Sequence, residues 1–507
     1  MRPVAGSFVV CALLAAMAGC LEAPTGTTSG SKKRSPDAAP AGDDADDAEQ
    51  EPSDPAPRSP LAAIVVDLGA VTAGQTVDLV VPKNALGFNV VVASEGAASL
   101  GIQTIKNPKD VVVLDSFTHA KSTMAVGEAV EGIASVSVPQ NDLPASAPTA
   151  GTWRVTFGGE GTNGRAKARV QVTSDAAFHG GLLDVHVHIP AGLKMANPSP
   201  SHVVDAASAP ADTDLGARID AFYLALGELF GIERGKVVFH DAPARFVAVN
   251  DDPTFYAATA VSAGLPEEQG LHVVLTNDLY RGEYSGYSPG VPGAANVTGT
   301  PMSSILVAVD ATVDPVSDGY TWLHEAAHFV GLQHTSESDG ITHDPLSDTP
   351  ECRGTRTPQC GDARNLMIPG WWPEGLVLPE ATKGQQAVFR GSPIYRAYAS
   401  GAVAKSLLAG LGGTSSERGT SPSASGAPPS AFAPRRVTAS GRQLTSLERW
   451  LGGTLCGSAQ QSPALVVRER GRDQAIADLQ AIARDADLPR PYRTKALRMI
   501  ERIGHGE

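Results

Sequence analysis

Residues Tyr320 to His334 read YTWLHEAAHFVGLQH, and the interpretation of the whole chain starts from them. Their apolar residues favour a helix seated on a sheet. His324 and His328 are four residues apart, so on a helix both imidazoles face the same side and can reach one ion. Glu325 projects beside them, where it can hold a water molecule bound to that ion. This spacing indicates a metal site that performs hydrolysis.

The residues that follow predict a third ligand. Gly331 can leave the helical conformation without a steric penalty, and the chain can then turn sharply. The turn brings His334 back towards the pair. Three neutral imidazoles leave a fourth position for water, which is the open arrangement of a catalytic Zn²⁺ ion. The alternative is a buried helix with incidental histidines, but three histidines and a glutamate on one short buried segment would need unusual compensation.

A methionine downstream adds a family resemblance. Met367 stands in the sequence Asn365-Leu366-Met367, 33 residues after His334. With the long histidine motif, this order is similar to the metzincin clan of zinc peptidases, in which a turn carrying a methionine lies beneath the metal. Asp348-Thr349-Pro350 and a nearby cysteine make the resemblance specifically pappalysin-like. It covers roughly residues 182–396 and is specific only between residues 324 and 367.

The resemblance implies a mechanism and a mode of substrate binding. Zinc lowers the pKa of bound water towards neutrality, and Glu325 would accept its proton and pass it to the leaving amine. An extended peptide would pair with an edge strand of the sheet, for which residues 303–309 are the candidate. Pappalysins carry a tyrosine two positions after the methionine, but Pro369 stands there, so no tyrosine is assigned to the oxyanion.

Two further pairs of residues lie between the motif and the methionine. Cys352 and Cys360 enclose seven residues, and in an exported protein they favour a local disulfide. By analogy with the family, Asp344 and Asp348 are candidate ligands of a structural Ca²⁺ ion. Exposed loop carboxylates are the plainer interpretation of these two aspartates.

The motif lies in a predicted α+β domain at residues 180–400, with helices packed on a mixed sheet. An alternating strand from Leu182 to Ile189 and an amphipathic helix from Asp214 to Phe230 precede the motif. His186 and His188 alternate on the strand and are interpreted as edge or surface residues, because the stronger metal signature lies elsewhere. Ahead of this domain, residues 61–175 contain about seven short β-type runs separated by turns, which predict an all-β sandwich.

The N-terminus reads as an export signal. Residues 1–19 carry a positive charge and a short apolar stretch, and end in small residues before Cys20, which resembles a bacterial lipoprotein signal. The resemblance implies lipidation of Cys20 and attachment to a membrane, with the outer membrane or cell surface favoured. An ordinary secretory signal is the alternative. Residues 20–60 are acidic, with few bulky apolar residues, and predict a disordered tether.

Composition limits the remaining possibilities. The chain has 507 residues and a net charge of −14, and so acidic a protein argues against nucleic acid as a partner. Residues 401–441 are rich in Gly, Ser and Pro and predict a flexible linker. Residues 442–507 predict a small helical module whose function the sequence does not indicate.

Together these features predict an exported, lipid-anchored zinc endopeptidase that acts on extracellular or periplasmic proteins. Two alternatives remain open. One is a binding lipoprotein whose peptidase domain has lost activity, although the intact Glu325 speaks against it. The other is a zinc hydrolase that acts on a bond other than a peptide bond.

Overall fold

The computed structural model describes most of the chain between residues 59 and 400 and one helix beyond it. The described residues are 59–95, 100–116, 132–159, 163–195, 201–309, 314–337, 342–353, 360–369, 378–400 and 472–484, with Ala496 and Ile500. The predicted signal, Cys20, nearly all of the tether and the linker lie outside them. Of the predicted C-terminal module, only helix α8 (Arg472–Arg484) is described at length.

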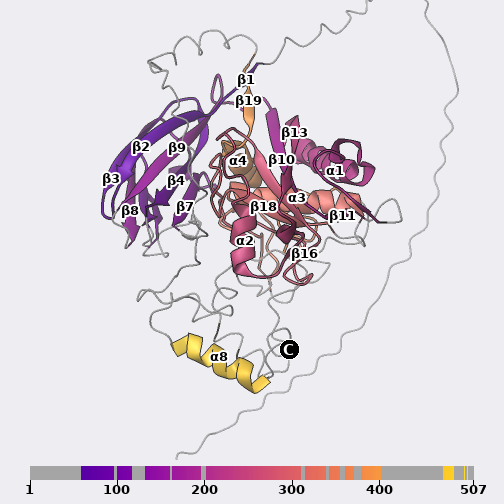
Figure 1. Ribbon diagram of the computed structural model, residues 1–507. Coiled ribbons are helices and arrows are strands. Elements are labelled where there is room, and N and C mark those ends of the chain that lie inside the picture. The colour runs from indigo at the N-terminus through magenta and orange to yellow at the C-terminus, as the bar shows by residue number, and fades with distance from the viewer. Residues whose placement is uncertain are drawn as a thin grey trace, which may run out of the picture. The chain divides into compact units, whose positions relative to one another are not determined.

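The first part of the described chain is a β-sandwich (Figure 1). Two four-stranded sheets, each antiparallel throughout, enclose one apolar core that includes Phe88 and Trp153, whose rings meet edge to face. The first sheet has the order β2 (Ile64–Val71), β9 (Gly164–Val172), β4 (Ala85–Ser94) and β7 (Ile133–Val138). The second has the order β3 (Thr76–Val81), β8 (Gly151–Gly159), β5 (Leu100–Lys106) and β6 (Val112–Asp115). The predicted sandwich is present, and β5 is a strand that the apolar runs did not predict.

A seven-stranded mixed sheet follows. Four strands run parallel to one another: β13 (Ile232–Ala242), β10 (Gly181–Pro190), β15 (Leu271–Thr276) and β18 (Ser304–Ala308). Three short strands pair antiparallel: β17 (Gly286–Tyr287) with β18, β19 (Arg396–Tyr398) with β10, and β1 (Pro60–Leu61) with β19. The predicted α+β class with a mixed sheet is therefore correct.

The interpretation of residues 303–309 as an edge strand is wrong. Strand β18 pairs with β15 on one side and with β17 on the other. On this side of the sheet the edge among the described strands is therefore β17, which has only two residues and so shows no alternation from which a strand could be predicted.

Helices cover the two faces of the mixed sheet. The face that includes Val187, Val273 and Ile305 packs against α1 (Thr213–Phe230) and α3 (Pro315–Val330). The opposite face, with Val274 and Leu306, packs against the short helix α2 (Asp252–Thr259). The predicted helix at residues 214–230 is confirmed, with its N-cap at Asp212 and its end at the left-handed Gly231.

Shorter elements complete the described structure. Helix α4 (Lys383–Gly391) begins with a capping box formed by Thr382 and Gln385. Two small ribbons are β11 (Lys194–Met195) with β12 (His202–Val203), and β14 (Ala248–Val249) with β16 (Asp278–Leu279). Three 3₁₀ turns are η1 (Pro144–Ser146), η2 (Ala209–Ala211) and η3 (Ala244–Val247).

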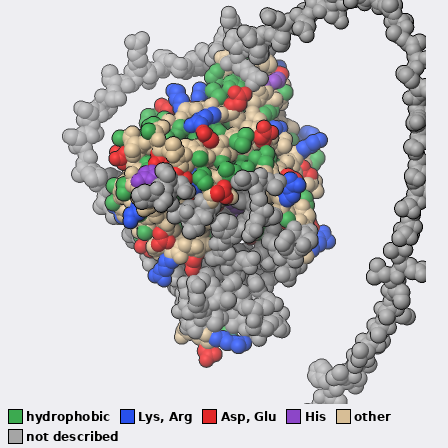
Figure 2. All heavy atoms as spheres, turned by 90° about the vertical axis from the view of Figure 1, so that its right-hand side faces the viewer, with side chains coloured by type: hydrophobic (Ala, Val, Ile, Leu, Met, Phe, Trp, Pro, Cys, Tyr) green, Lys and Arg blue, Asp and Glu red, His purple; other side chains and the backbone are tan. Residues whose placement is uncertain are grey.

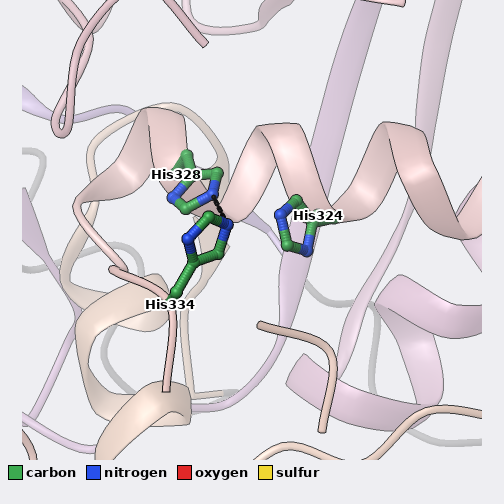
Figure 3. A group of neighbouring side chains, drawn as sticks. All are labelled: His324, His328 and His334. Atoms are coloured by element: carbon green, nitrogen blue, oxygen red, sulfur yellow. Dashed lines mark hydrogen bonds between the residues drawn. The ribbon is translucent and has the colours of Figure 1, made fainter. Parts of the chain in front are cut away.

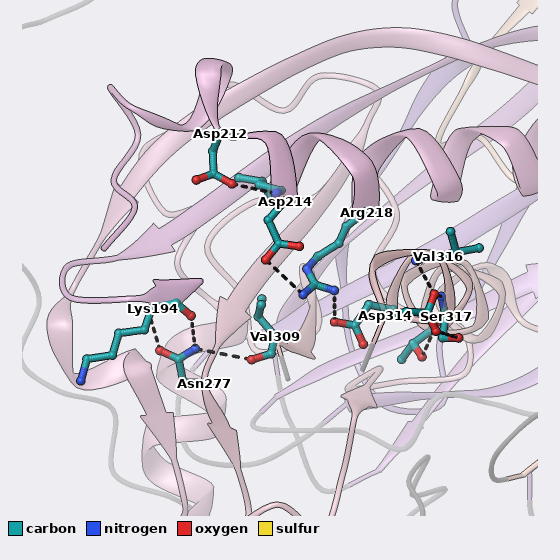
Figure 4. A network of polar contacts seen from close by, with 12 residues as sticks. Lys194, Asp212, Asp214, Arg218, Asn277, Val309, Asp314, Val316 and Ser317 are labelled. Carbon is teal, nitrogen blue, oxygen red and sulfur yellow. Dashed lines mark hydrogen bonds and ion pairs between the residues drawn. The ribbon is translucent and has the colours of Figure 1, made fainter. Parts of the chain in front are cut away.

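A buried ion network joins α1 to α3. The guanidinium of Arg218 on α1 is fully buried, with Nη1 2.5 Å from Asp318 Oδ2 on α3 and Nη2 3.4 Å from Asp214 Oδ2 (Figure 4). The helices also approach closely, because a Cβ on Gly319 would lie 2.6 Å from the Cβ of Ala221. The network and the close approach hold the motif helix against its neighbour.

Polar contacts also link the sandwich to the mixed-sheet domain. Ser135 Oγ donates a buried hydrogen bond of 2.7 Å to the carbonyl of Gly293, and Gln171 Nε2 donates one of 3.0 Å to the carbonyl of Tyr395. On the face seen in Figure 2, acidic and basic side chains are interspersed among apolar ones. Among the described helices, none is both long and apolar enough to span a bilayer.

Candidate metal centre

The structure brings the three predicted histidine ligands together. His324 and His328 project from α3, and His334 comes from the segment that follows the helix (Figure 3). One nitrogen of each ring lies within 4.8 Å of the others, and His328 Nε2 is 3.2 Å from His334 Nε2. All three side chains are buried.

The turn that returns His334 depends on glycine. Gly331 ends α3 with φ 117°, a left-handed conformation that side chains with a Cβ rarely adopt. Its N–H donates to the His328 carbonyl at 2.9 Å, and Leu332 N donates to the Ala327 carbonyl at 2.9 Å. At its other end the helix is capped by Asp314, whose carboxylate accepts hydrogen bonds from the first turn (Figure 4).

Hydrogen bonds fix which nitrogen of each imidazole faces the centre. His324 Nδ1 lies 2.7 Å from the Leu366 carbonyl, and His328 Nδ1 lies 2.7 Å from the Leu332 carbonyl. A carbonyl oxygen only accepts, so these Nδ1 atoms carry the proton and the Nε2 lone pairs are free to bind a metal. His334 Nδ1 is 3.1 Å from Glu337 Oε1, which is the carboxylate–imidazole arrangement found behind many zinc ligands.

Burial keeps the ligands in the form that a metal needs. Desolvation lowers the pKa of His324 to about 3 and holds the pKa of His328 well below its ordinary value, and neighbouring imidazoles lower both further. Both rings are therefore neutral near pH 7, as metal ligands must be. A donor set of three imidazole Nε2 atoms, each on a ring whose Nδ1 is anchored, fits Zn²⁺.

The predicted methionine lies in a turn bonded to two parts of the histidine motif. Met367 is fully buried, and its carbonyl accepts a hydrogen bond of 2.9 Å from Thr335 N, next to His334. The preceding carbonyl, of Leu366, is the acceptor for His324. This turn therefore holds the first ligand directly and the third through its neighbour.

A pair of amide side chains supports that turn. Asn365 and Gln385 exchange two hydrogen bonds of 2.9 Å, each amide donating to the other. Asn365 Oδ1 also accepts from Met367 N at 2.8 Å. No role for Gln385 is predicted from the sequence, and only the folded chain shows that this residue of α4 supports the turn.

Glu325, the predicted general base, is a buried residue of α3 that directly follows His324. The edge strand β17 lies directly against it, because a Cβ on Gly286 would be 2.5 Å from Glu325 Cγ and 2.7 Å from Oε1. Glu337 is a residue of the site that the sequence patterns did not predict. Its position three residues after His334 is the one local signal for it in the sequence.

The other predicted site residues have different outcomes. Cys352 and Cys360 form the predicted disulfide. The interpretation of Asp344 as an exposed loop acid is wrong, because it is buried and desolvation raises its pKa to about 7. Its Oδ1 accepts from Thr349 Oγ1, and the Asp348 carboxylate accepts from Gly384 N at 2.8 Å. Both carboxylates that were candidates for Ca²⁺ therefore already have protein donors.

The interpretation of His186 and His188 as surface residues is also wrong. His188 is 1% exposed, and both belong to a cluster of four with His240 on β13 and His272 on β15. His186 lies opposite His272, and His188 opposite His240, in the registers of the parallel strands. The ring centroids are 4.7 Å apart for His186 and His272 and 4.9 Å apart for His188 and His240, which is the spacing of neighbouring strands.

The cluster is hydrogen-bonded in pairs and does not converge on one point. His186 Nδ1 is 3.0 Å from His240 Nε2, and His188 Nε2 is 3.0 Å from His272 Nδ1. In both pairs the centroids are 5.3 Å apart, so the rings meet edge to edge as in an N–H···N bond. All four contacts have interplanar angles between 16° and 32°, whereas rings of the motif triad cross at up to 87°.

Comparisons with known proteins add limited likenesses. No protein-family model matches the chain, and no curated protein matches it. Among solved structures, archaemetzincin from Methanopyrus kandleri is 17% identical, with a TM-score of 0.22, and the match covers 42% of this chain and 89% of that one. A Bacillus licheniformis lipase in its propeptide form is 11% identical, with a TM-score of 0.16, over 23% of each chain. The assignment of the metal centre therefore rests on its own geometry.

Proposed function

We propose that the protein is a zinc-dependent endopeptidase of the metzincin type. The observation that carries the proposal is the buried triad His324, His328 and His334, in which two Nδ1 atoms are bound to carbonyls and the third to a carboxylate. This leaves three Nε2 atoms for one ion. A bound Zn²⁺ ion would supply Lewis acidity and make a water molecule acidic enough to attack near neutral pH.

The chain's own residues supply the proton transfers. Glu325 follows the first proposed ligand on α3, and its carboxylate would take the proton from the attacking water. The same group then gives that proton to the amine that leaves when the peptide bond breaks. Because the site is buried, these charge movements occur with little competing water.

Strand β17 is the proposed place for an extended substrate. It pairs with β18 on one side, and no other described strand pairs with its second side. Main-chain hydrogen bonds to that side would lay a peptide along the edge next to Glu325. This assignment moves the proposed substrate contact from residues 303–309 to residues 286–287.

The test is the variant Glu325→Ala in the full chain. We expect it to retain one equivalent of zinc and to lose hydrolysis of denatured casein, because the ligands remain and the base is gone. Glu351→Ala, which removes a surface carboxylate paired with Arg353, is the matched control and should cleave normally. A wild-type protein that holds one zinc ion and cleaves no peptide across a broad library would overturn the proposal. That result would favour a binding protein. If the protein hydrolyses a substrate at a bond other than a peptide bond, the result would instead favour a hydrolase of that bond.

We also propose that the enzyme is exported and held at a membrane by lipid on Cys20. The lipoprotein-like N-terminus supports this proposal. Mass spectrometry of the mature N-terminus tests it. A diacylated or triacylated Cys20 is the expected result, and an unmodified N-terminus elsewhere contradicts it.

A further inference from the structure

The edge strand β17 lies unusually close to the catalytic carboxylate. A Cβ on Gly286 would meet Glu325 at 2.5 Å from Cγ and 2.7 Å from Oε1, closer than real Cβ atoms come to other heavy atoms. Gly286 does not have positive φ, so a backbone conformation reserved for glycine does not explain its presence. The explanation is space, because the strand backbone itself touches the side chain of Glu325.

The direction of the neighbouring side chain supports this contact. Successive residues of a strand point to opposite faces, and Tyr287 packs edge to face on Phe255 of α2, with centroids 4.5 Å apart. Gly286 therefore presents its missing side chain to the other face, where α3 lies. Both residues are held by antiparallel pairing with β18, opposite Leu306 and Val307.

A second glycine continues the contact one helical turn along. A Cβ on Gly293 would lie 2.2 Å from the ring of Phe329, four residues after Glu325 on α3. Gly293 N also donates to the Phe329 carbonyl at 2.9 Å. The segment that starts with β17 thus lies along α3 and meets Glu325 and Phe329 with bare backbone.

We propose that Gly286 is a positioning residue that sets the rotamer of Glu325, a role that rests on the proposed peptidase function. The flexible Glu325 side chain has the strand backbone on one side and its own helix on the other. The Gly286 Cβ position is 2.7 Å from Oε1 and 2.9 Å from Cδ of Glu325, so the carboxylate already rests against the β17 backbone and cannot move further in that direction. This restriction would hold the side chain in one rotamer for its proposed role as the base. A Cβ at position 286 would displace it, because the three heavy atoms nearest to that Cβ position all belong to Glu325.

The test is a double-mutant cycle in the full chain, using Gly286→Ala, Glu325→Asp and their combination. Aspartate is one methylene shorter, so its carboxylate recedes from the added methyl group. We expect Gly286→Ala alone to retain one zinc ion and KM while kcat falls by about 10²-fold, the effect of a misplacement of about 1 Å. We also expect Gly286→Ala to lower Tm by several degrees when Glu325 is intact, and by less than half as much when it is combined with Glu325→Asp.

The matched control is Gly293→Ala with and without Glu325→Asp. It introduces a clash with Phe329, which a shorter residue at 325 cannot relieve, so its loss of Tm should be the same in both backgrounds. Equal losses of Tm for Gly286→Ala in both backgrounds, or a kcat equal to wild type, overturn the positioning role. The Tm cycle needs no substrate. Absence of hydrolysis by the wild type would thus end the proposed function, and with it the role in positioning, while the cycle separately shows whether the two residues collide.

Discussion

At the scale of single residues, each histidine of the candidate metal centre has a partner that holds its ring. For His324 and His328 the partner is a backbone carbonyl, which no substitution removes. For His334 it is the side chain of Glu337, 3.1 Å from Nδ1. Glu337 is thus the one partner whose contribution to metal binding can be measured by mutation.

We therefore expect Glu337→Gln to weaken zinc binding by about 10- to 100-fold, the usual effect of losing a partner behind a ligand. The amide carries no charge to raise the basicity of the imidazole, although it can still accept a hydrogen bond. Competition with a chelating dye measures the affinity. Glu380→Gln, which alters an exposed pair with Arg364, should bind zinc as the wild type does. Equal affinities for the two variants would contradict the role of Glu337.

At the scale of elements, the metal centre depends on how α1 is joined to α3. Arg218 is buried between Asp214 and Asp318, so removing its charge leaves two buried carboxylates without their cation. We expect Arg218→Met to lower the free energy of unfolding by about 3–5 kcal/mol, measured by denaturant titration. Arg234→Met removes an exposed pair with Asp220 and should cost less than about 1 kcal/mol. A difference of less than about 1 kcal/mol between them would argue against the network.

The histidine cluster on β10, β13 and β15 makes stability depend on pH. Burial, with smaller effects of neighbouring imidazoles, lowers the pKa of His188 to about 2 and that of His272 to about 3, from the ordinary 6.5. Between those values and pH 6.5 the unfolded chain binds more protons than the folded one. Stability is therefore fully present above pH 6.5 and falls as the pH is lowered towards 3, by up to about 1.4 kcal/mol per pH unit for each group.

The measurement is the free energy of unfolding between about pH 7 and pH 5, with and without the pair His188→Gln and His272→Gln. The free energy of unfolding of the double variant should fall less steeply as the pH is lowered, because two groups that gain protons on unfolding are gone. His179→Gln replaces a surface histidine beside Asp175 and serves as the control. Identical slopes for the double variant and the wild type would show that these imidazoles take up protons in the folded state.

What could be predicted from the sequence was what lies close together along it. Helical periodicity was enough to predict that His324 and His328 face the same side. The freedom of φ at glycine was enough to predict the turn at Gly331, and a known order of motifs was enough to predict the role of Met367. The cluster of His186 and His188 with His240 and His272 could not be predicted, because partners 54 and 84 residues away meet only through strand register. For the same reason β18 was mistaken for an edge, since the two residues of β17 give no periodic signal.

At the scale of the whole molecule, the sandwich and the mixed-sheet domain share buried polar contacts. Ser135 donates to the Gly293 carbonyl, which belongs to the segment lying on α3, and Gln171 donates to the Tyr395 carbonyl. Separating the two parts would exchange these hydrogen bonds for hydrogen bonds to water, so each contributes about 0.5–1.5 kcal/mol to the contact. Pro60 and Leu61 pair with β19 of the mixed sheet before the chain enters the sandwich, so that sheet includes strands from both sides of the sandwich in the sequence.

We therefore expect the sandwich and the mixed-sheet domain to unfold in one transition. Pulsed hydrogen exchange along a denaturant series, read by mass spectrometry, should give the same midpoint for peptides from β4 and β8 as for peptides from α3. Ser135→Ala should lower both midpoints together, because the lost hydrogen bond stabilises the contact between the parts. Ser317→Ala removes an exposed hydroxyl contact with Asp314 and should leave both midpoints nearly unchanged. Two separate midpoints in the wild type would mean that the sandwich is an independent module, and that the segment over α3 keeps its position without it.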